Sequence, residues 1–319
     1  MTSDRPQYSV VVPVYRNEAT LAALVERLAE LATALDGPLE VVFVVDGSPD
    51  GSLVLLRRLL AEQEAFSSQL IALSRNFGSF SAIRAGLAAA EGELVAVMAA
   101  DLQEPVSLVR DFFEGLESGT YDVAVGTRSS RSDPGGSARA SRIFWSLYRR
   151  LVQPEIPKGG VDVFACTRQV AGELVRMDES HTSLVGLVYW LGFRRLEVPY
   201  DRLPRPEGQS AWSFRRKVRY LLDSIFSFTD LPITLIIALG AVGVVVSTVA
   251  AVAVLVAWAS DQIDVAGYTP LILAVFFMTS LIIIALGIVG SYVWRTYENS
   301  KGRPGAVAMS HERFDGGGS

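Results

Sequence analysis

Acidic and amide side chains follow several apolar runs of this sequence at the points where the runs end. Asp101 and Gln103 come directly after residues 93–99, and Asp46 follows residues 39–45. A carboxylate with an amide two residues further on offers oxygen ligands to a hard divalent cation, and the phosphates of a bound substrate can complete the shell. Such a Lewis acid suits a diphosphate leaving group. By spacing alone, an Asp at such a position is as often a helix N-cap or turn residue.

Other kinds of site are disfavoured by composition and motif. The single cysteine, Cys166, and the two histidines, His181 and His311, argue against a disulfide framework, a Cys-based zinc site and a His-rich metal site. Cys166 is interpreted as a small core residue rather than a nucleophile. The sequence has no Gly-x-Gly-x-x-Gly after the first apolar run, no Gly-Lys-Ser/Thr phosphate loop and no Gly-x-Ser-x-Gly elbow. The net charge of −5 gives no case for nucleic-acid binding.

Short β-branched runs alternate with helical patterns over the first 126 residues. We expect strands at residues 8–14, 39–45, 69–73, 93–99 and 121–126, and helices at 20–35, 52–64, 81–90 and 106–116. This alternation predicts an α/β fold with a parallel sheet. Ligands of such sheets bind beyond the carboxyl ends of the strands. The polar clusters at 16–18, 46–50, 74–76 and 101–103 all follow strands, so they are predicted to converge on one crevice.

Two long uncharged runs, residues 232–260 and 265–294, explain the high mean hydropathy of +0.31. Each exceeds the roughly 20 residues that cross a bilayer core, although a pair of buried core helices is the alternative. Arg and Lys lie outside the runs and only acidic charges lie between them, which predicts that both flanks and both termini are cytoplasmic. The expected organisation is a domain at 1–200, a basic amphipathic segment at 201–231, membrane helices at 232–260 and 265–294, and a tail at 295–319.

A set of motifs adds to this interpretation. VVPVYRNEATL is followed by VVDGSPDGS, SRNFG, ADLQEP, GTR and the late series Arg205-x-x-Gly208-x-Ser210-x-Trp212. This combination, with two membrane helices after it, resembles the family 2 glycosyltransferases, and among them the polyprenyl-phosphate glycosyltransferases. The resemblance covers residues 8–304. It implies a GT-A fold, a nucleoside diphosphate sugar donor, with UDP-sugars the first candidates, and a polyprenyl phosphate acceptor. Direct attack by that lipid phosphate would invert the configuration of the sugar, and the basic flanks of the membrane helices place the transfer at the cytoplasmic face of the cell membrane.

The resemblance also implies Mg²⁺ or Mn²⁺, a homo-oligomer with a tetramer as one form, and a role for each matching residue. Asp101 and Gln103 match the metal segment and, with Asp162 near the acceptor, form the catalytic set. The donor-binding set is Pro13, Tyr15, Asn17, Glu18, Asp46, Arg75, Asn76, Arg84, Gly86 and Arg128. The acceptor-binding set is Arg205, Ser210 and Trp212, joined by the basic pair Arg215 and Arg216, which could equally be membrane anchors.

This sequence departs from the family pattern at four positions. Val45 and Ala99 stand where the family has an additional acid, Phe164 replaces an arginine and Ala211 a lysine. The missing acids leave open a non-catalytic subunit that binds sugar nucleotides, and the lipid could be a different acceptor such as diacylglycerol. The Gln-x-x-Arg-Trp motif of processive synthases is absent, which argues against cellulose-type polymerisation.

Overall fold

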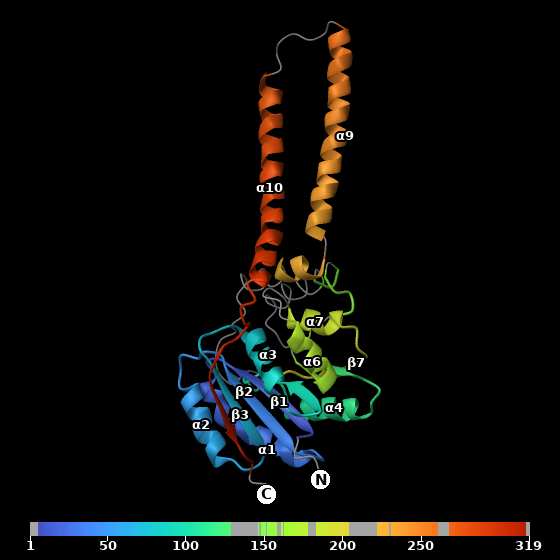
Figure 1. Cartoon of the computed structure of the whole chain (residues 1–319). Coiled ribbons are helices and arrows are strands. Elements are labelled where there is room, and N and C mark those ends of the chain that lie inside the picture. Colours follow the sequence, from blue (N-terminus) through green and yellow to red (C-terminus); the bar gives the residue numbers. More distant parts are fainter. Residues whose placement is uncertain are drawn as a thin grey trace.

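The computed structural model describes residues 6–128, 146, 148–150, 152–157, 161, 163–177, 183–203, 222–229, 231–260 and 268–316. A domain built on a sheet lies at the foot of a long hairpin formed by two helices (Figure 1). Both ends of the described chain lie on the domain side, so the polypeptide enters the hairpin from the domain and returns to it.

One mixed sheet of eight strands organises the described part of the domain, in the order β7-β5-β6-β4-β1-β2-β3-β8. The strands are β1 (Tyr8–Val14), β2 (Leu39–Val45), β3 (Ser67–Leu73), β4 (Leu94–Val97), β5 (Val123–Arg128), β6 (Phe164–Thr167), β7 (Arg195–Tyr200) and β8 (Ala308–Phe314). The pairs β1–β2, β1–β4, β2–β3 and β5–β7 are parallel, whereas β6 and β8 are antiparallel to their neighbours. The expected α/β fold with a mostly parallel sheet is confirmed.

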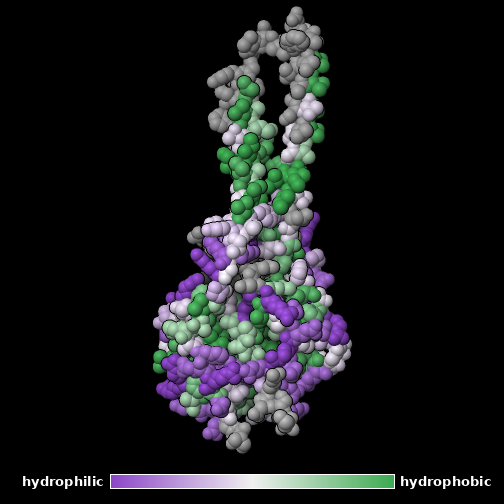
Figure 2. All heavy atoms as spheres, viewed as in Figure 1, coloured by the Kyte–Doolittle hydropathy of each residue, from purple (hydrophilic) through white to green (hydrophobic). Residues whose placement is uncertain are grey.

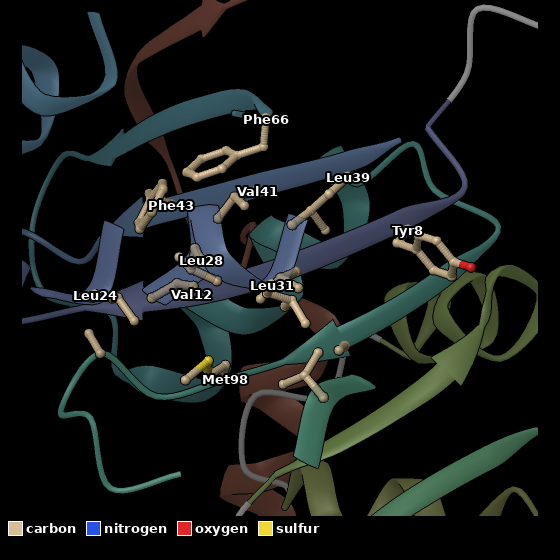
Figure 3. Close-up of a cluster of buried hydrophobic side chains, with 14 of the residues drawn as sticks. Tyr8, Val12, Leu24, Leu28, Leu31, Leu39, Val41, Phe43, Phe66 and Met98 are labelled. Atoms are coloured by element: carbon tan, nitrogen blue, oxygen red, sulfur yellow. The ribbon is translucent and has the colours of Figure 1, made fainter. Parts of the chain in front are cut away.

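Helices cover both faces of this sheet. The described helices of the domain are α1 (Leu21–Ala34), α2 (Ser52–Glu62), α3 (Ser79–Ala89), α4 (Val106–Glu117), α6 (Arg168–Arg176) and α7 (Leu184–Trp190), with a 3-10 turn at Glu18–Thr20. Successive side chains of β1 point to opposite faces of the sheet. Val12 therefore packs in the hydrophobic cluster beneath α1, and Val11 packs in the cluster beneath α3. Figure 3 shows Leu24 and Leu28 of α1 lying against Val12 and Phe43. Strands buried on both faces explain the continuous apolar runs.

The observed elements agree most closely with the prediction where burial is complete. β1 and β2 have the predicted bounds, and the four predicted helices end within two residues of those observed. β6, α6, β7 and β8 were not assigned from the sequence. Cys166 lies fully buried in β6, where burial raises the pKa of its thiol to about 12. Its interpretation as a core residue is therefore confirmed.

The hairpin consists of α9 (Leu231–Ala259) and α10 (Tyr268–Ser300). Hydrophobic residues gather along both helices, whereas hydrophilic residues dominate the visible surface of the domain (Figure 2). Among the described residues, Phe277–Ser300 is long and apolar enough to cross a membrane, and none of its most apolar stretch is buried. The short helix Leu222–Phe228 and the segment Leu231–Gly243, bent by 83° from each other, form a second candidate if they are counted as one span.

Gly86 supplies a test of how α3 reaches the sheet. A Cβ on this buried glycine would lie 2.3 Å from Val11 Cγ1 and 3.2 Å from Val44 Cγ2. We expect Gly86→Ala to destabilise the domain by about 1–3 kcal/mol through overpacking. Gly172→Ala in α6 is the matched control, because a Cβ there meets no atom within 4 Å and gains up to about 1 kcal/mol of helix propensity. Equal midpoints of chemical denaturation for the two variants would contradict this packing role.

Candidate functional site

The carboxyl ends of β1, β2, β3, β4 and β7 meet at one edge of the sheet, and hydrogen bonds join the loops that follow them. The first link joins the loops after β2 and β3. Asp46 is 2% exposed, and its carboxylate accepts hydrogen bonds from the backbone N–H groups of Phe77 at 2.7 Å and Gly78 at 2.9 Å. Asn76 Nδ2 donates to the backbone oxygen of Asp46 at 3.3 Å. Asp46 thereby fixes the loop Ser74–Gly78 at the N-terminus of α3.

Gly47 allows these two loops to touch. Its φ of +55° lies in the left-handed region, and a Cβ there would lie 2.3 Å from the backbone carbon of Arg75. Both features require glycine. The Arg75 guanidinium stacks 3.9 Å from the centre of the Phe77 ring and remains exposed to solvent. The structure thus presents an exposed cation on the loop that follows β3.

The second link joins the loops after β1 and β2. Arg16 N–H donates to Ser48 Oγ at 2.8 Å, and Gly51 N–H donates to Glu18 Oε2 at 2.8 Å. Asp50 Oδ1 accepts from Ser48 Oγ at 2.6 Å, and its Oδ2 accepts from the Glu18 N–H at 3.3 Å. Asp50 therefore acts as a turn residue that organises both loops.

The protonation of Asp50 follows from these contacts. Partial burial raises the pKa of the Asp50 carboxyl. Hydrogen bonds donated by Ser48, Ser52 and Glu18 lower this pKa and outweigh the effect of burial, so the pKa lies below its ordinary value. The ionised form is thus the one that the folded loops favour. This contribution to stability is present above the pKa of the unfolded chain and is lost as the pH falls through the folded pKa.

The third link joins the loops after β1 and β4. Thr20 Oγ1 donates to the backbone oxygen of Ala100 at 2.7 Å. The same two loops hold the structure's positive-φ residues other than glycine within the described chain, Arg16 at +58° and Leu102 at +59°. Such conformations cost roughly 1–3 kcal/mol each and persist where the surroundings impose them. Leu102 is held by burial of its side chain in the core, which directs Asp101 and Gln103 toward the edge.

The fourth link joins the loops after β4 and β7. Arg202 Nη2 donates to Gln103 Oε1 at 2.5 Å, and the Leu203 N–H donates to the backbone oxygen of Gln103 at 2.9 Å. The Gln103 N–H donates to Asp101 Oδ1 at 3.3 Å, which closes a tight turn. Sequence reasoning missed Arg202. Its position just after a strand was a usable signal, but its partner lies 99 residues away.

Among the described residues, Asp101 offers a divalent cation a carboxylate in the loop that follows β4. The described residues contain no group of three or more His, Cys, Asp or Glu side chains able to hold a metal ion by themselves. Asp101 stands at the edge of the sheet, while the Gln103 amide oxygen already accepts from a guanidinium. Mg²⁺ is commonly bound by one or two carboxylates together with substrate phosphates and water. The donor set therefore fits a metal that is held largely by its substrate.

The structure separates the expected site residues into three groups. Those at the edge of the sheet are Pro13, Tyr15, Asn17, Glu18, Asp46, Arg75, Asn76, Asp101 and Gln103, with Arg128 at the end of β5. Arg84 donates to the backbone oxygen of Val175 at 3.1 Å and Gly86 packs against the sheet, so the observed contacts of both tie α3 to its neighbours. Asp162, Arg205, Ser210, Trp212, Arg215 and Arg216 lie outside the described residues.

Comparison with known proteins identifies the chain. The model of the family described as "Glycosyl transferase family 2" matches residues 9–173, which include four of the strand-end loops. The chain belongs to glycosyl transferase family 2. This transferase is 32% identical to an uncharacterized glycosyltransferase of Synechocystis over 93% of each chain. It is 29% identical to the undecaprenyl-phosphate 4-deoxy-4-formamido-L-arabinose transferase of Proteus mirabilis, over 93% of this chain and 91% of the relative.

Two further similarities complete the comparison. The bactoprenol glucosyl transferase of Shigella phage SfV is 27% identical over 96% of this chain and 99% of its own. A solved mannosyltransferase of Pyrobaculum calidifontis aligns with 89% of this chain and 87% of its own, at 18% identity and a TM-score of 0.47. Membership of the family makes the transferase an enzyme and sets aside the alternative of a non-catalytic subunit.

Replacement of Asp46 tests the first link. In Asp46→Asn an amide NH₂ replaces one carboxylate oxygen. Either the Phe77 or the Gly78 N–H then faces another donor and loses its acceptor. We expect a loss of about 1–3 kcal/mol in unfolding free energy and faster hydrogen exchange in residues 74–78. Asp111→Asn is the control, because that carboxylate makes only an exposed ion pair with Arg110 at 3.5 Å. Unchanged exchange in Asp46→Asn would refute the link.

Proposed function

We propose that this transferase moves a sugar from a nucleoside diphosphate sugar, with UDP-sugars the first candidates, to a polyprenyl phosphate at the cytoplasmic face of the cell membrane. The names of relatives that match over nearly the whole chain support a polyprenyl-phosphate acceptor. The observation that carries the proposal is the position of the site. Both connections between the domain and the hairpin meet the carboxyl edge of the sheet, at Leu203 after β7 and at Val307 before β8.

The membrane arrangement is part of the proposal. α9 and α10 are 29 and 33 residues long, and either length exceeds the roughly 20 residues that span a bilayer core. Two spans place the domain and both termini on the same side, and the basic flanks favour the cytoplasmic side. The short helix Leu222–Phe228, bent by 83° from α9, would then lie along the membrane surface beneath the spans. A homo-oligomer is the remaining prediction from the resemblance.

The proposed chemistry needs little help from a base. A phosphate monoester has a second pKa of about 6, so the acceptor is largely a dianion at pH 7. A bond forms between a phosphate oxygen and the anomeric carbon, while the bond from that carbon to the diphosphate oxygen breaks and the nucleoside diphosphate leaves with the electron pair. Attack from the opposite face inverts the anomeric configuration. The protein's task is to position both substrates and to stabilise the leaving diphosphate.

Named residues are proposed for this task. Asp101 would hold Mg²⁺ or Mn²⁺, which supplies charge to the leaving diphosphate when it is bound. Gln103, expected from the sequence as a second ligand, faces the Arg202 guanidinium, whose charge disfavours a cation at the same oxygen. We assign Gln103 to orienting Arg202 toward the crevice. Arg75, Asn76 and the other edge residues are assigned to the donor, and the acceptor set from Arg205 to Arg216, with Asp162, keeps its proposed role.

Asp101→Asn tests the metal assignment. It removes the one carboxylate charge while it preserves size, so we expect transfer to fall by about 100-fold or more. Donor affinity measured by calorimetry should no longer increase when Mn²⁺ is added, whereas the variant should unfold at the parent temperature. Asp111→Asn serves as the charge-matched control. Full activity with metal-dependent donor binding in Asp101→Asn would overturn the assignment.

A transfer assay tests the function itself. The purified protein is reconstituted with undecaprenyl phosphate or with diacylglycerol, supplied with UDP- and GDP-sugars and Mg²⁺, and assayed for nucleoside diphosphate release. The proposal predicts release that depends on undecaprenyl phosphate with one donor. Release only with diacylglycerol would show that the acceptor is not a polyprenyl phosphate. Failure of both lipids to cause release would contradict the proposed function.

A further inference from the structure

The segment after the hairpin returns to the domain and completes the sheet. β8 pairs with β3 in antiparallel register, from Ser68 opposite Phe314 to Leu73 opposite Ala308. The Ser74 N–H donates to the backbone oxygen of Val307 at 2.9 Å. The chain that returns from α10 therefore contacts the loop Ser74–Gly78, which Asp46 also holds.

Side chains fix this strand more than burial does. Arg57 donates to both carboxylate oxygens of Glu312 at 2.7 and 2.6 Å. Arg313 pairs with Glu91 at 2.6 Å, and His311 Nε2 lies 2.6 Å from Gln69 Oε1. Met309, by contrast, is 66% exposed. No residue of β8 is buried, although Phe314 packs against the core, so the strand is held mainly by its ladder and by these polar pairs.

The hairpin is attached to the two outermost strands of the sheet. β7 is the first strand in the sheet order and β8 is the last. The polypeptide leaves the domain after β7, passes through α9 and α10, and returns as β8. The hairpin is therefore connected to the domain at both of its ends (Figure 1). A domain joined by one linker rotates about it, whereas a second attachment at the far edge removes that freedom.

The foot of the hairpin adds contacts that resist tilting. Arg295 of α10 donates to Asp223 Oδ1 at 2.7 Å, and the ring of Phe226 meets that of Tyr292 edge-on at 5.3 Å. Phe228 packs so closely on α7 that a Cβ on Gly186 would lie 2.5 Å from its ring. The short helix Leu222–Phe228 thereby contacts both the hairpin and the domain.

We propose that β8 is a positioning tether, which holds the carboxyl edge of the sheet toward the bilayer and so sets the rate of transfer to an acceptor embedded in a membrane. This inference rests on the proposed function. A lipid phosphate sits at a fixed depth, and an aqueous donor is bound to the domain. The two reacting atoms meet only when the domain keeps one orientation, and small misplacements carry large penalties in rate.

The test lengthens the tether without removing the strand. A flexible insertion of about 12 Gly and Ser residues after Gly302 adds a reach of roughly 20 Å. Gly302 lies in an exposed turn with φ +57°, and a Cβ there meets no atom within 4 Å. The matched control carries the same insertion after Gly119, another exposed glycine with positive φ and open surroundings.

We expect the Gly302 insertion to lower transfer to undecaprenyl phosphate in vesicles by about 10-fold. Transfer to a short, water-soluble isoprenyl phosphate and the affinity for the donor should stay within about twofold of the parent, as should every activity of the Gly119 insertion. An equal fall with both acceptors would assign β8 to stability alone. An unchanged rate in vesicles would also overturn the tether.

A spectroscopic arm is independent of activity. Because Cys166 is buried, spin labels can be placed selectively at Ser118→Cys and Val293→Cys, both exposed in the structure. The parent should give a narrow distribution of distances between the labels in vesicles, and the Gly302 insertion a broad one. Equal widths would refute the tether. If the Gly302 insertion broadens the narrow parent distribution but the parent transfers no sugar to undecaprenyl phosphate, the proposed function fails, and β8 keeps its orienting role without a role in transfer.

Discussion

The buried carboxylate of Asp46 is the interaction on which the shape of the catalytic edge depends. It accepts the N–H groups of Phe77 and Gly78 and so joins the loops after β2 and β3, which the Asn76 hydrogen bond and the close approach of Gly47 to Arg75 also hold together. A buried carboxylate without such donors would be strongly destabilising. From this link the hydrogen bonds continue through Glu18 and Thr20 to the loop after β4, and through Gln103 to Arg202. The strand-end loops consequently form one connected structure rather than separate flexible segments.

This connected edge fits a reaction in which positioning matters more than proton transfer. A phosphate acceptor is already a nucleophile near neutral pH, so the site needs charge for the leaving diphosphate and a fixed approach for the lipid. Among the connected strand-end loops, Asp101 and Arg202 lie nearest the point where the chain leaves the domain after β7. Arg75 lies nearest β8, where the chain returns from the hairpin. The two ends of this set of loops thus coincide with the two attachments of the hairpin.

The sequence predicted those parts of the molecule whose signals are local. β1 and β2 are fully buried, so their unbroken β-branched runs gave their bounds, and the strand-end rule placed Asp46 and Asp101 at one edge. β8 could not be found in this way. It mixes polar and apolar residues, none of them buried, and the β3 ladder that stabilises it lies about 240 positions earlier in the chain.

The candidate site shows the same division. The positions of Asn17, Arg75 and Gln103 followed from pattern and resemblance. The contacts of Asp46, Gly86 and Arg202 depend on backbone groups or side chains that only the tertiary structure brings near. No local pattern distinguishes a carboxylate that binds a ligand from one that accepts two N–H groups of a neighbouring loop. The bend at Leu222–Phe228 and the return of the chain at Val307 are equally non-local.

The chemical structure of the lipid product shows whether the lipid phosphate itself attacks the sugar. Product isolated from vesicles that contain the transferase, a nucleotide sugar and undecaprenyl phosphate would be examined by phosphorus and proton NMR. Direct attack by the lipid phosphate should give one phosphodiester phosphorus for each sugar and an anomeric configuration opposite to that of the donor. A glycolipid without a phosphodiester, or one that retains the donor configuration, would contradict direct attack by the lipid phosphate.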